Sequence, residues 1–338
     1  MKPFARFSAL SLATSLVLAG CATSESSPVP ETPPLDSASP SLSIVVSTTV
    51  LGSIATDIAQ CAAGQDTTVT VVMPVGVDPH DFQPSSAQVA AMVSADLVIV
   101  NGLGLEEGLL PAVEGIGADG ARVLDIGELI DPLPFGAEAS PYTEDDGHGH
   151  GEAAGEEEES GHGTYDPHFW MDMERMALAA TLIGEEIESL GGKGSAACGE
   201  EVAATIATAQ EGVVDILSGI PESRRVLVTD HDALSYFAES FGFTVIGVVI
   251  PGGSTLGEPD SQELAALVRV IQDQDVSAIF GDATLSNQIL EVLASEAGRD
   301  VVVVSLFIGS LGGPDSGATS YIEMMTTNAE RIAQALAD

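Results

Sequence analysis

Short runs of aliphatic and β-branched residues alternate with longer amphipathic segments along most of this chain. Short apolar runs bounded by turn residues are typical of buried strands, and apolar positions three and four residues apart indicate helices. The pattern predicts strands at 43–47, 67–73, 97–100, 122–124, 226–229, 244–249, 278–280 and 301–306. It predicts helices at 51–61, directly after Ser85, and at 105–113, 171–190, 196–217, 234–240, 261–274, 285–297 and 320–337.

This regular alternation predicts an α/β fold in which helices cover both faces of mostly parallel sheets. The alternation occurs twice, and the long helical pattern within 193–220 separates the two series. We therefore expect an N-terminal α/β lobe at 43–192, a bridging helix at 193–220 and a C-terminal α/β lobe at 221–338.

The first 21 residues have the pattern of a secretion signal. Two basic residues precede an apolar stretch that is too short to span a membrane. The stretch ends in Leu18-Ala19-Gly20-Cys21, which resembles the bacterial lipobox and implies lipidation of Cys21. An ordinary cleaved signal is the alternative. Residues 22–42 are rich in Ser, Pro and Thr, and are predicted to form a disordered tether.

The charge of the chain restricts its partners. It has 10 Lys and Arg against 51 Asp and Glu, a formal net charge of -41. Such a surface repels the phosphates of nucleic acids and attracts cations. Part of this charge also serves solubility, which is the simpler interpretation.

Beyond Cys21 the chain contains only Cys61 and Cys198. In a protein exported to an oxidising compartment two thiols are candidates for a disulfide. Sequence alone leaves open whether these two meet. A zinc site of thiolates is not expected, because neither cysteine has a second one nearby.

Three of the six histidines, His148, His150 and His162, lie in the segment 144–163, which also contains eight acidic residues and several glycines. It has no hydrophobic periodicity and is predicted to be a surface loop. Histidines among acids favour weak metal capture; a solvated linker is the alternative.

The other three histidines, His80, His168 and His231, each lie next to an aspartate at the border of an apolar or aromatic segment. His80 and His231 follow predicted strands, and ligands of open α/β sheets bind beyond the carboxyl ends of strands. Three imidazoles with a carboxylate or water form a normal zinc shell. Taken singly, each histidine would more often be a surface or capping residue; together they predict a metal site.

Several motifs of this chain are similar to those of the zinc and manganese solute-binding lipoproteins of ABC importers. The markers are Gly76-Val77-Asp78-Pro79-His80, Asp166-Pro167-His168-Phe169-Trp170, Thr229-Asp230-His231-Asp232-Ala233 with Tyr236-Phe237, and the acidic histidine loop. The resemblance implies a metal-receptor fold of the periplasmic-binding-protein type, with His80, His168 and His231 as ligands between the lobes. It also implies an ABC permease and its ATPase as partners.

The resemblance leaves the fourth ligand open. The family often supplies an aspartate after the last strand, where this chain has Gly309. Water or Asp282, which follows the predicted strand 278–280, are the candidates for this position. Manganese members tend to have a carboxylate as the third ligand, so His231 favours zinc over manganese.

We therefore expect a lipid-anchored, extracytoplasmic zinc receptor, with a manganese or iron receptor of the same fold as the nearest alternative. A zinc hydrolase is a second alternative, but the chain has neither a His-Glu-x-x-His helix nor a Gly-x-Ser-x-Gly elbow. An adhesin whose metal only stiffens the fold is a third. For a receptor, we expect zinc affinity to fall through the pH range of histidine titration, and lobe movements to be small and to loosen the side of His231.

Overall fold

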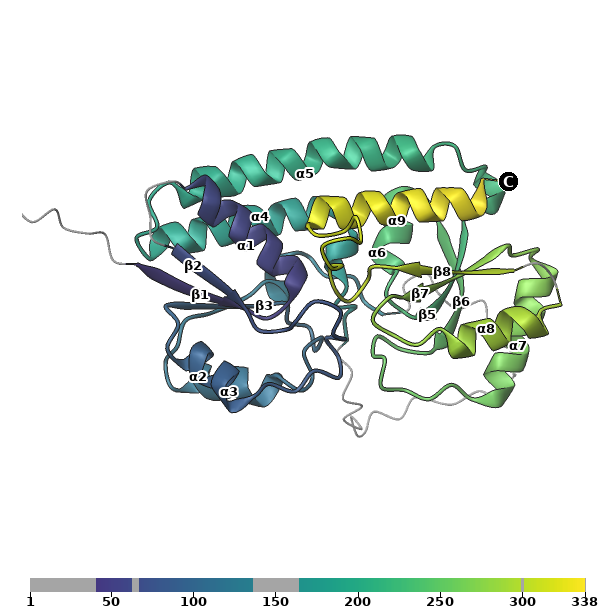
Figure 1. Ribbon diagram of the computed structural model, residues 1–338, viewed down its shortest axis with the longest axis horizontal. Helices are drawn as coiled ribbons and strands as arrows, with labels where there is room; N and C mark the ends of the chain where they lie inside the picture. The colour runs from purple at the N-terminus through teal and green to yellow at the C-terminus, as the bar shows by residue number, and fades with distance from the viewer. Residues whose placement is uncertain (1–40, 63–66, 136–163, 299–300, 338) are drawn as a thin grey trace, which may run out of the picture. The chain divides into compact units, whose positions relative to one another are not determined.

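Helices surround two four-stranded sheets, one from each half of the sequence (Figure 1). The structure is a computed structural model and describes residues 41–62, 67–135, 164–298 and 301–337. Cys21 and the segment 144–163 lie outside these residues. The α/β fold with parallel sheets in two lobes, predicted from the alternation of strands and helices, is confirmed.

The N-terminal sheet has the strand order β2-β1-β3-β4, and its pairings are all parallel. Its elements are β1 (Leu42–Val46), α1 (Thr49–Cys61), β2 (Thr67–Val71), α2 (Ser86–Val93), β3 (Leu97–Val100), α3 (Leu110–Ala118), β4 (Val123–Asp125) and the 3-10 turn η1 (Gly127–Leu129). The helix after Ser85 begins as predicted, because Ser85 Oγ accepts the Gln88 N–H and Gln88 Oε1 accepts the Ser85 N–H.

The helix predicted at 105–113 instead occupies Leu110–Ala118. The preceding segment turns too sharply for a helix, since Leu103 has a φ of 56° and Gly104 a φ of 82°. The Glu106 carboxylate stabilises this turn by accepting the backbone N–H groups of Asn101 and Gly102 at 2.7 and 3.1 Å. The helix therefore begins only where Pro111 fits its first turn.

The C-terminal sheet has the order β6-β5-β7-β8, again with parallel pairings. Its elements are η3 (Glu222–Arg224), β5 (Val226–His231), α6 (Ser235–Phe241), β6 (Thr244–Ile250), α7 (Ser261–Asp273), β7 (Ala278–Asp282), α8 (Gln288–Glu296) and β8 (Val302–Leu306). The two sheets have the same strand order: the first strand of each half lies between the second and the third, and the fourth follows the third at the edge.

Long helices connect and cover the sheets: η2 (Phe169–Met171) leads into α4 (Met173–Ser189), then α5 (Ser195–Leu217), and α9 (Tyr321–Leu336) ends the described chain. Helix α5 contacts α1 and α4 as well as α9 (Figure 1). Glycines bring α4 and α5 close together: a Cβ on Gly184 would lie 2.5 Å from the Ser195 oxygen, and one on Gly199 would lie 2.7 Å from the Ala180 oxygen. Among the described residues no helix combines the length and apolarity of a membrane span.

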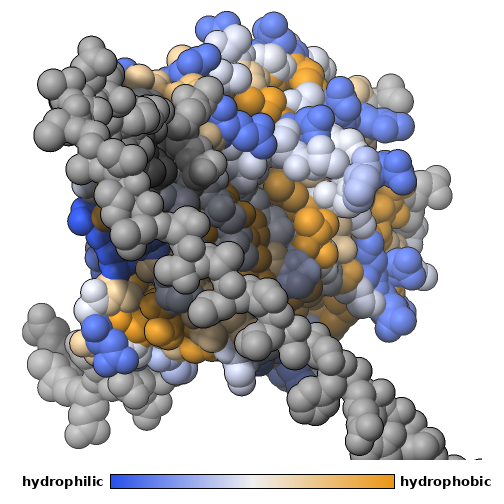
Figure 2. All heavy atoms as spheres, turned by 60° about the vertical axis from the view of Figure 1, so that its left-hand side comes forward, coloured by the Kyte–Doolittle hydropathy of each residue, from blue (hydrophilic) through white to orange (hydrophobic). Residues whose placement is uncertain are grey.

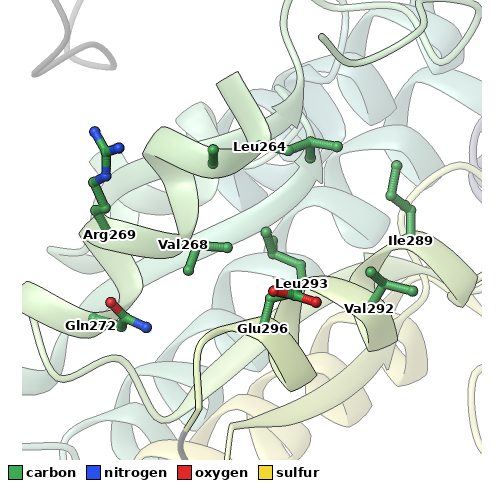
Figure 3. Close-up of a pocket in the computed structure, with 9 residues that line it drawn as sticks. Leu264, Val268, Arg269, Gln272, Ile289, Val292, Leu293 and Glu296 are labelled. Atoms are coloured by element: carbon green, nitrogen blue, oxygen red, sulfur yellow. The ribbon is translucent and has the colours of Figure 1, made fainter. Parts of the chain in front are cut away.

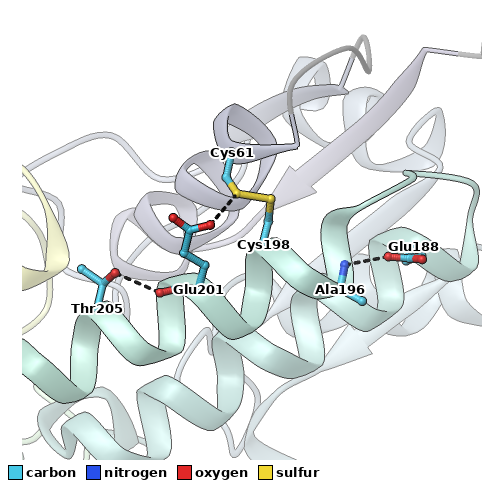
Figure 4. Close-up of a disulfide and its surroundings, with 6 residues drawn as sticks. All are labelled: Cys61, Glu188, Ala196, Cys198, Glu201 and Thr205. Carbon is cyan, nitrogen blue, oxygen red and sulfur yellow. Dashed lines mark hydrogen bonds between the residues drawn. A yellow bond between two sulfur atoms is a disulfide. The ribbon is translucent and has the colours of Figure 1, made fainter.

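A disulfide ties α1 to α5 in the structure. Cys61 is the last residue of α1 and Cys198 lies in the first turn of α5, with their Cα atoms 5.7 Å apart (Figure 4). The Glu201 carboxylate lies 3.6 Å from Cys61 Sγ. A disulfide sulfur carries no hydrogen, so this approach is a contact rather than a hydrogen bond. The cross-link spans a sequence separation of 137 residues.

One hydrophobic cluster runs through both halves of the described chain. It contains side chains from β1 and α1, from η2 and α4, and from α6, β7 and α9. Two smaller clusters lie on the opposite faces of the sheets: Val45, Val98 and Met92 belong to the N-terminal one, and Ile279 and Leu267 to the C-terminal one. Each sheet thus has one face in the shared core and one face covered by its own helices.

Candidate metal centre

The structure brings His80, His168 and His231 together. His80 lies in the loop after β2, His168 directly precedes η2, and His231 ends β5. One ring nitrogen of each lies within 4.8 Å of the other two, and the Nε2 atoms of His80 and His168 are 3.3 Å apart. Nitrogens bound to one tetrahedral zinc at about 2.0–2.1 Å are themselves about 3.3 Å apart. The histidines, each at most 2% exposed, can therefore share one cation.

The three histidines are fixed by the aspartates that precede them in the sequence. Each aspartate accepts the backbone N–H of its histidine, at 2.8 to 3.0 Å. The pairs are Asp78 with His80, Asp166 with His168, and Asp230 with His231. These hydrogen bonds explain why each of the three histidines has an aspartate one or two residues before it in the sequence.

Two of these aspartates also orient the imidazole ring. His168 Nδ1 lies 2.8 Å from Asp166 Oδ1, and His231 Nδ1 lies 2.9 Å from Asp230 Oδ1. A carboxylate at Nδ1 holds the proton on that nitrogen and leaves the lone pair of Nε2 for a metal. The site thus presents preoriented neutral donors rather than mobile side chains.

Burial and charge give the two oriented histidines opposite pKa shifts. Burial, together with the charge of His231, holds the pKa of His168 well below its ordinary value. Burial acts to lower the pKa of His231 as well, but its hydrogen bond to Asp230 and the charge of Asp230 outweigh burial, so its pKa is raised. Burial raises the pKa of Asp166 to about 7. Of these two imidazoles, His231 is therefore the one that protons occupy first.

The Asp282 carboxylate is hydrogen-bonded to backbone groups in this structure, and its role as a fourth ligand stays a prediction. Its Oδ1 accepts the Thr284 N–H at 2.8 Å, and its Oδ2 accepts the Gly309 N–H at 2.7 Å. Its own N–H donates to Asp230 Oδ2 at 2.6 Å. The carboxylate is thus occupied with the backbone behind His231, where burial raises its pKa to about 6.

The neighbours of Gly309 explain why this position has no side chain. A Cβ at this position would lie 2.8 Å from Pro79 Cδ and 2.9 Å from Asp282 Oδ2. Any side chain here would push against the loop that carries His80. In this arrangement the position leaves no room for a carboxylate ligand.

Glu107 is a residue near the site that the sequence analysis missed. Its Oε1 lies 3.9 Å from His80 Nδ1, and its side chain is 27% exposed. The segment 101–109 follows the carboxyl end of β3, at the same edge of the sheet where the His80 loop follows β2. That position was the available signal, but Glu106 and Glu107 are adjacent acids, and the sequence does not show which of them faces the site.

Aromatic groups lock the His168 segment to the C-terminal half. Trp170 Nε1 donates to the Ile308 oxygen at 2.9 Å, and the Tyr321 hydroxyl donates to the Trp170 oxygen at 2.7 Å. The Tyr236 hydroxyl donates to the Asp166 oxygen at 2.9 Å. These bonds hold the backbone on both sides of His168 in place.

A concavity between α7 and α8 has a different chemistry from the histidine site (Figure 3). Aliphatic side chains such as Leu264, Val268 and Ile289 line it, with Arg269 and Glu296 among its polar groups. The face in Figure 2 likewise mixes hydrophobic and hydrophilic side chains. This groove offers a cation no convergent set of ligands, unlike the histidine site.

His148, His150 and His162 of the predicted capture loop, and the predicted lipidation site Cys21, lie outside the described residues. Metal capture by the loop stays a prediction.

Comparisons with known proteins agree with the fold. The sequence model of the family described as zinc-uptake complex component A, periplasmic, matches residues 44–335. A manganese-binding lipoprotein of Halalkalibacterium halodurans is 27% identical over 87% of this chain and 88% of its own length. An iron-binding protein of Yersinia pestis is 26% identical over 83% of each chain. The structure of a periplasmic zinc-binding protein from Treponema pallidum matches with a TM-score of 0.73 and 25% identity, over 88% of this chain and 100% of the other.

Proposed function

We propose zinc as the cargo of this protein, from the premise that the chain belongs to the family of the periplasmic component A of zinc-uptake complexes. Proteins of this family are solute-binding receptors of ABC importers and not enzymes. This chain is accordingly an extracytoplasmic, metal-binding receptor lipoprotein. In our proposal it captures Zn²⁺ outside the membrane and passes it to a permease driven by a cytoplasmic ATPase.

The observation that carries the choice of zinc is the type of donor. The group of metal-ligating atoms found among the described residues consists of three buried imidazoles, from His80, His168 and His231. Imidazole donors suit zinc, whereas manganese prefers carboxylate, carbonyl and water oxygens. Water is our candidate for the fourth position, since the Asp282 carboxylate is held by backbone N–H groups.

A manganese or iron receptor is the second candidate, because relatives of similar identity are named for those metals. The acids around the site, Asp78 and Glu107 among them, would tolerate a metal that prefers oxygen. They stand behind His80, however, and not in the group of ligand atoms. Membership of a receptor family argues against the hydrolase alternative. A role in cell adhesion stays a prediction.

Uptake requires release as well as capture, and the chemistry of the ligands suggests how protons assist it. Zinc needs neutral imidazoles, so protons compete with it for the same lone pairs. Of His168 and His231, His231 has the raised pKa and is the ligand that protons compete for at the higher pH. We expect release to begin on the side of His231, with small movements of the lobes, because α5 and the shared core join them.

Native mass spectrometry of the metal-stripped protein, titrated with Zn²⁺ and with Mn²⁺, tests the cargo. We expect one tightly held Zn²⁺ that excess Mn²⁺ does not displace. A variant without residues 144–163 should keep that ion and lose additional weakly bound ones. Preferential retention of Mn²⁺ would overturn the proposal, and loss of the tight ion on loop deletion would move the site from the histidine cluster to the loop.

A further inference from the structure

His80 differs from the other two histidines in what faces its Nδ1. Its Nε2 lies 3.3 Å from His168 Nε2, so its Nδ1 is on the far side of the ring from the site. On that side the carboxylate of Glu107 has its Oε1 3.9 Å from Nδ1. This distance is about 1 Å longer than an N–H···O hydrogen bond. Glu107 thus stands toward His80 as Asp166 and Asp230 stand toward their histidines, but at a greater distance.

Glu107 is held by a residue from the other half of the chain. Ser254 Oγ donates a hydrogen bond of 2.6 Å to Glu107 Oε1, the oxygen that faces His80. Ser254 is only 4% exposed and lies in the segment 251–260 between β6 and α7, here called the β6–α7 loop. The carboxylate therefore joins the surroundings of His80 to the C-terminal lobe.

The β6–α7 loop makes further contacts of the same kind. Thr255 Oγ1 donates to Asp78 Oδ2 at 2.6 Å, and the other oxygen of Asp78 accepts the His80 N–H. Gly253 lies against Phe135, since a Cβ on it would be 1.9 Å from Phe135 Cζ. Consecutive hydroxyls of one loop thus bind both carboxylates that flank His80.

The same loop also touches the segment of His231, because the Gly252 oxygen accepts the Asp232 N–H at 3.4 Å. The loop is therefore connected to two of the three predicted ligands, one in each lobe. A movement that separates the loop from the N-terminal lobe would withdraw Ser254 from Glu107 and Thr255 from Asp78 together.

We propose that Glu107 is the positioning residue that orients His80 for the metal, and that Ser254 holds it in this role from the opposite lobe. The inference rests on the proposed zinc-binding function. An imidazole that gives Nε2 to Zn²⁺ keeps its proton on Nδ1, and a carboxylate there accepts a hydrogen bond from this N–H and makes Nε2 a stronger ligand. Retention of zinc then depends on the contact between Ser254 and Glu107, so that opening of this contact weakens the His80 ligand.

The rate of zinc release tests this coupling. Zn²⁺-loaded protein is mixed with an excess of a fluorescent chelator, and the dissociation rate constant is compared between variants. E107Q keeps an oxygen for Ser254 but removes the charge. It should release zinc at least about tenfold faster, because loss of a group that orients a metal ligand lowers metal affinity by at least about tenfold. S254A should accelerate release by a smaller factor. The double variant should release zinc no faster than E107Q, because both changes act through one contact.

Glu211→Gln is the matched control, since Glu211 is exposed on α5 and its loss changes the net charge by the same amount. It should release zinc at the rate of the unmodified protein. Release by E107Q at that same rate would overturn the proposal. So would independent, multiplicative effects of E107Q and S254A.

A second measurement separates orientation of His80 from general loosening. In ¹⁵N-histidine-labelled, zinc-loaded protein, the Nδ1 proton of each ligand gives its own resonance. E107Q should shift the His80 proton and hasten its exchange with water, and should leave those of His168 and His231 in place. Equal changes at all three, or none, would refute the role of Glu107. If the unmodified protein binds no zinc, the proposed function itself fails; zinc binding with an unaltered His80 signal removes only this inference.

Discussion

Replacement of Asp230 by Asn should change the pH dependence of zinc binding in a specific way. Asp230 Oδ1 accepts both the Nδ1–H and the backbone N–H of His231, and Oδ2 accepts the Asp282 N–H. The asparagine keeps the shape and one acceptor oxygen, and it loses the negative charge in a position that is only 4% exposed. The variant thus changes the charge and, because an amide nitrogen cannot accept the Asp282 N–H, that hydrogen bond as well, while the packing is kept.

The expected effect has two parts of opposite sign. Loss of an orienting carboxylate lowers metal affinity about 10- to 100-fold when the histidines are neutral. The same loss removes the hydrogen bond and the charge of Asp230, which oppose burial most strongly, so the pKa of His231 falls although Asp282 and Asp78 still act to raise it. Since one pKa unit is worth about 1.4 kcal/mol, or about tenfold in proton competition, the variant suffers less from acid than the unmodified protein.

The ratio of zinc affinities, unmodified over D230N, should therefore be largest near about pH 8 and fall towards about pH 5.5, across the histidine range. Competition with a chelator of known affinity at each pH measures it, with E211Q as the charge control. Thermal unfolding of the metal-free forms shows that the fold is kept. A ratio that stays constant or grows on acidification would refute the role given to His231 as the proton-sensitive ligand.

Three further outcomes follow from the structure. Gly309→Ala should weaken zinc binding in a chelator competition, because its Cβ would press on Pro79 and the His80 loop; unchanged affinity would show that the loop yields freely. Loss of the disulfide by C61S with C198S should lower the free energy of unfolding by at most about 5 kcal/mol, the chain-entropy value for so long a loop, seen in denaturant titrations; an equal midpoint for both proteins would contradict this. Metal-free protein should become more heat-stable as pH falls from about 8 to about 6, because the pKa of Asp166 is raised by burial and the folded state is favoured when this carboxyl is protonated. In D166N this gain in thermal stability should shrink. An equal gain in both proteins would show that other acids cause it.

The strands and most helices could be predicted because their apolar runs are buried on regular faces. Strand β3 and the start of α2 after Ser85 lie where the sequence places them, since local patterns determine both. The prediction for helix α3 was wrong by several residues. Its start depends on Glu106, which binds the backbone of Asn101 and Gly102 and thereby prevents an earlier helix, and no periodicity shows such a bond.

The candidate site shows the same limit. The sequence selected His80, His168 and His231 because each stands beside an aspartate, and the structure reveals that this aspartate fixes the backbone of its histidine. The groups that surround the ligand side chains are brought there by tertiary contacts, which the sequence pattern does not show. The Asp282 carboxylate is tied to backbone N–H groups. Glu107, which the sequence analysis did not single out, faces the His80 ring from the turn after β3.

The hydrophobic cluster common to both halves has a consequence for how the molecule comes apart. Phe169, Tyr236 and Tyr321 each contribute to it from a different segment, and all are at most 1% exposed. A fragment cut after α5 would leave this interior open to water along its whole length, so neither piece should persist alone. Heat should melt the receptor in a single cooperative step, and a bound ion should raise the temperature of that step for both halves alike.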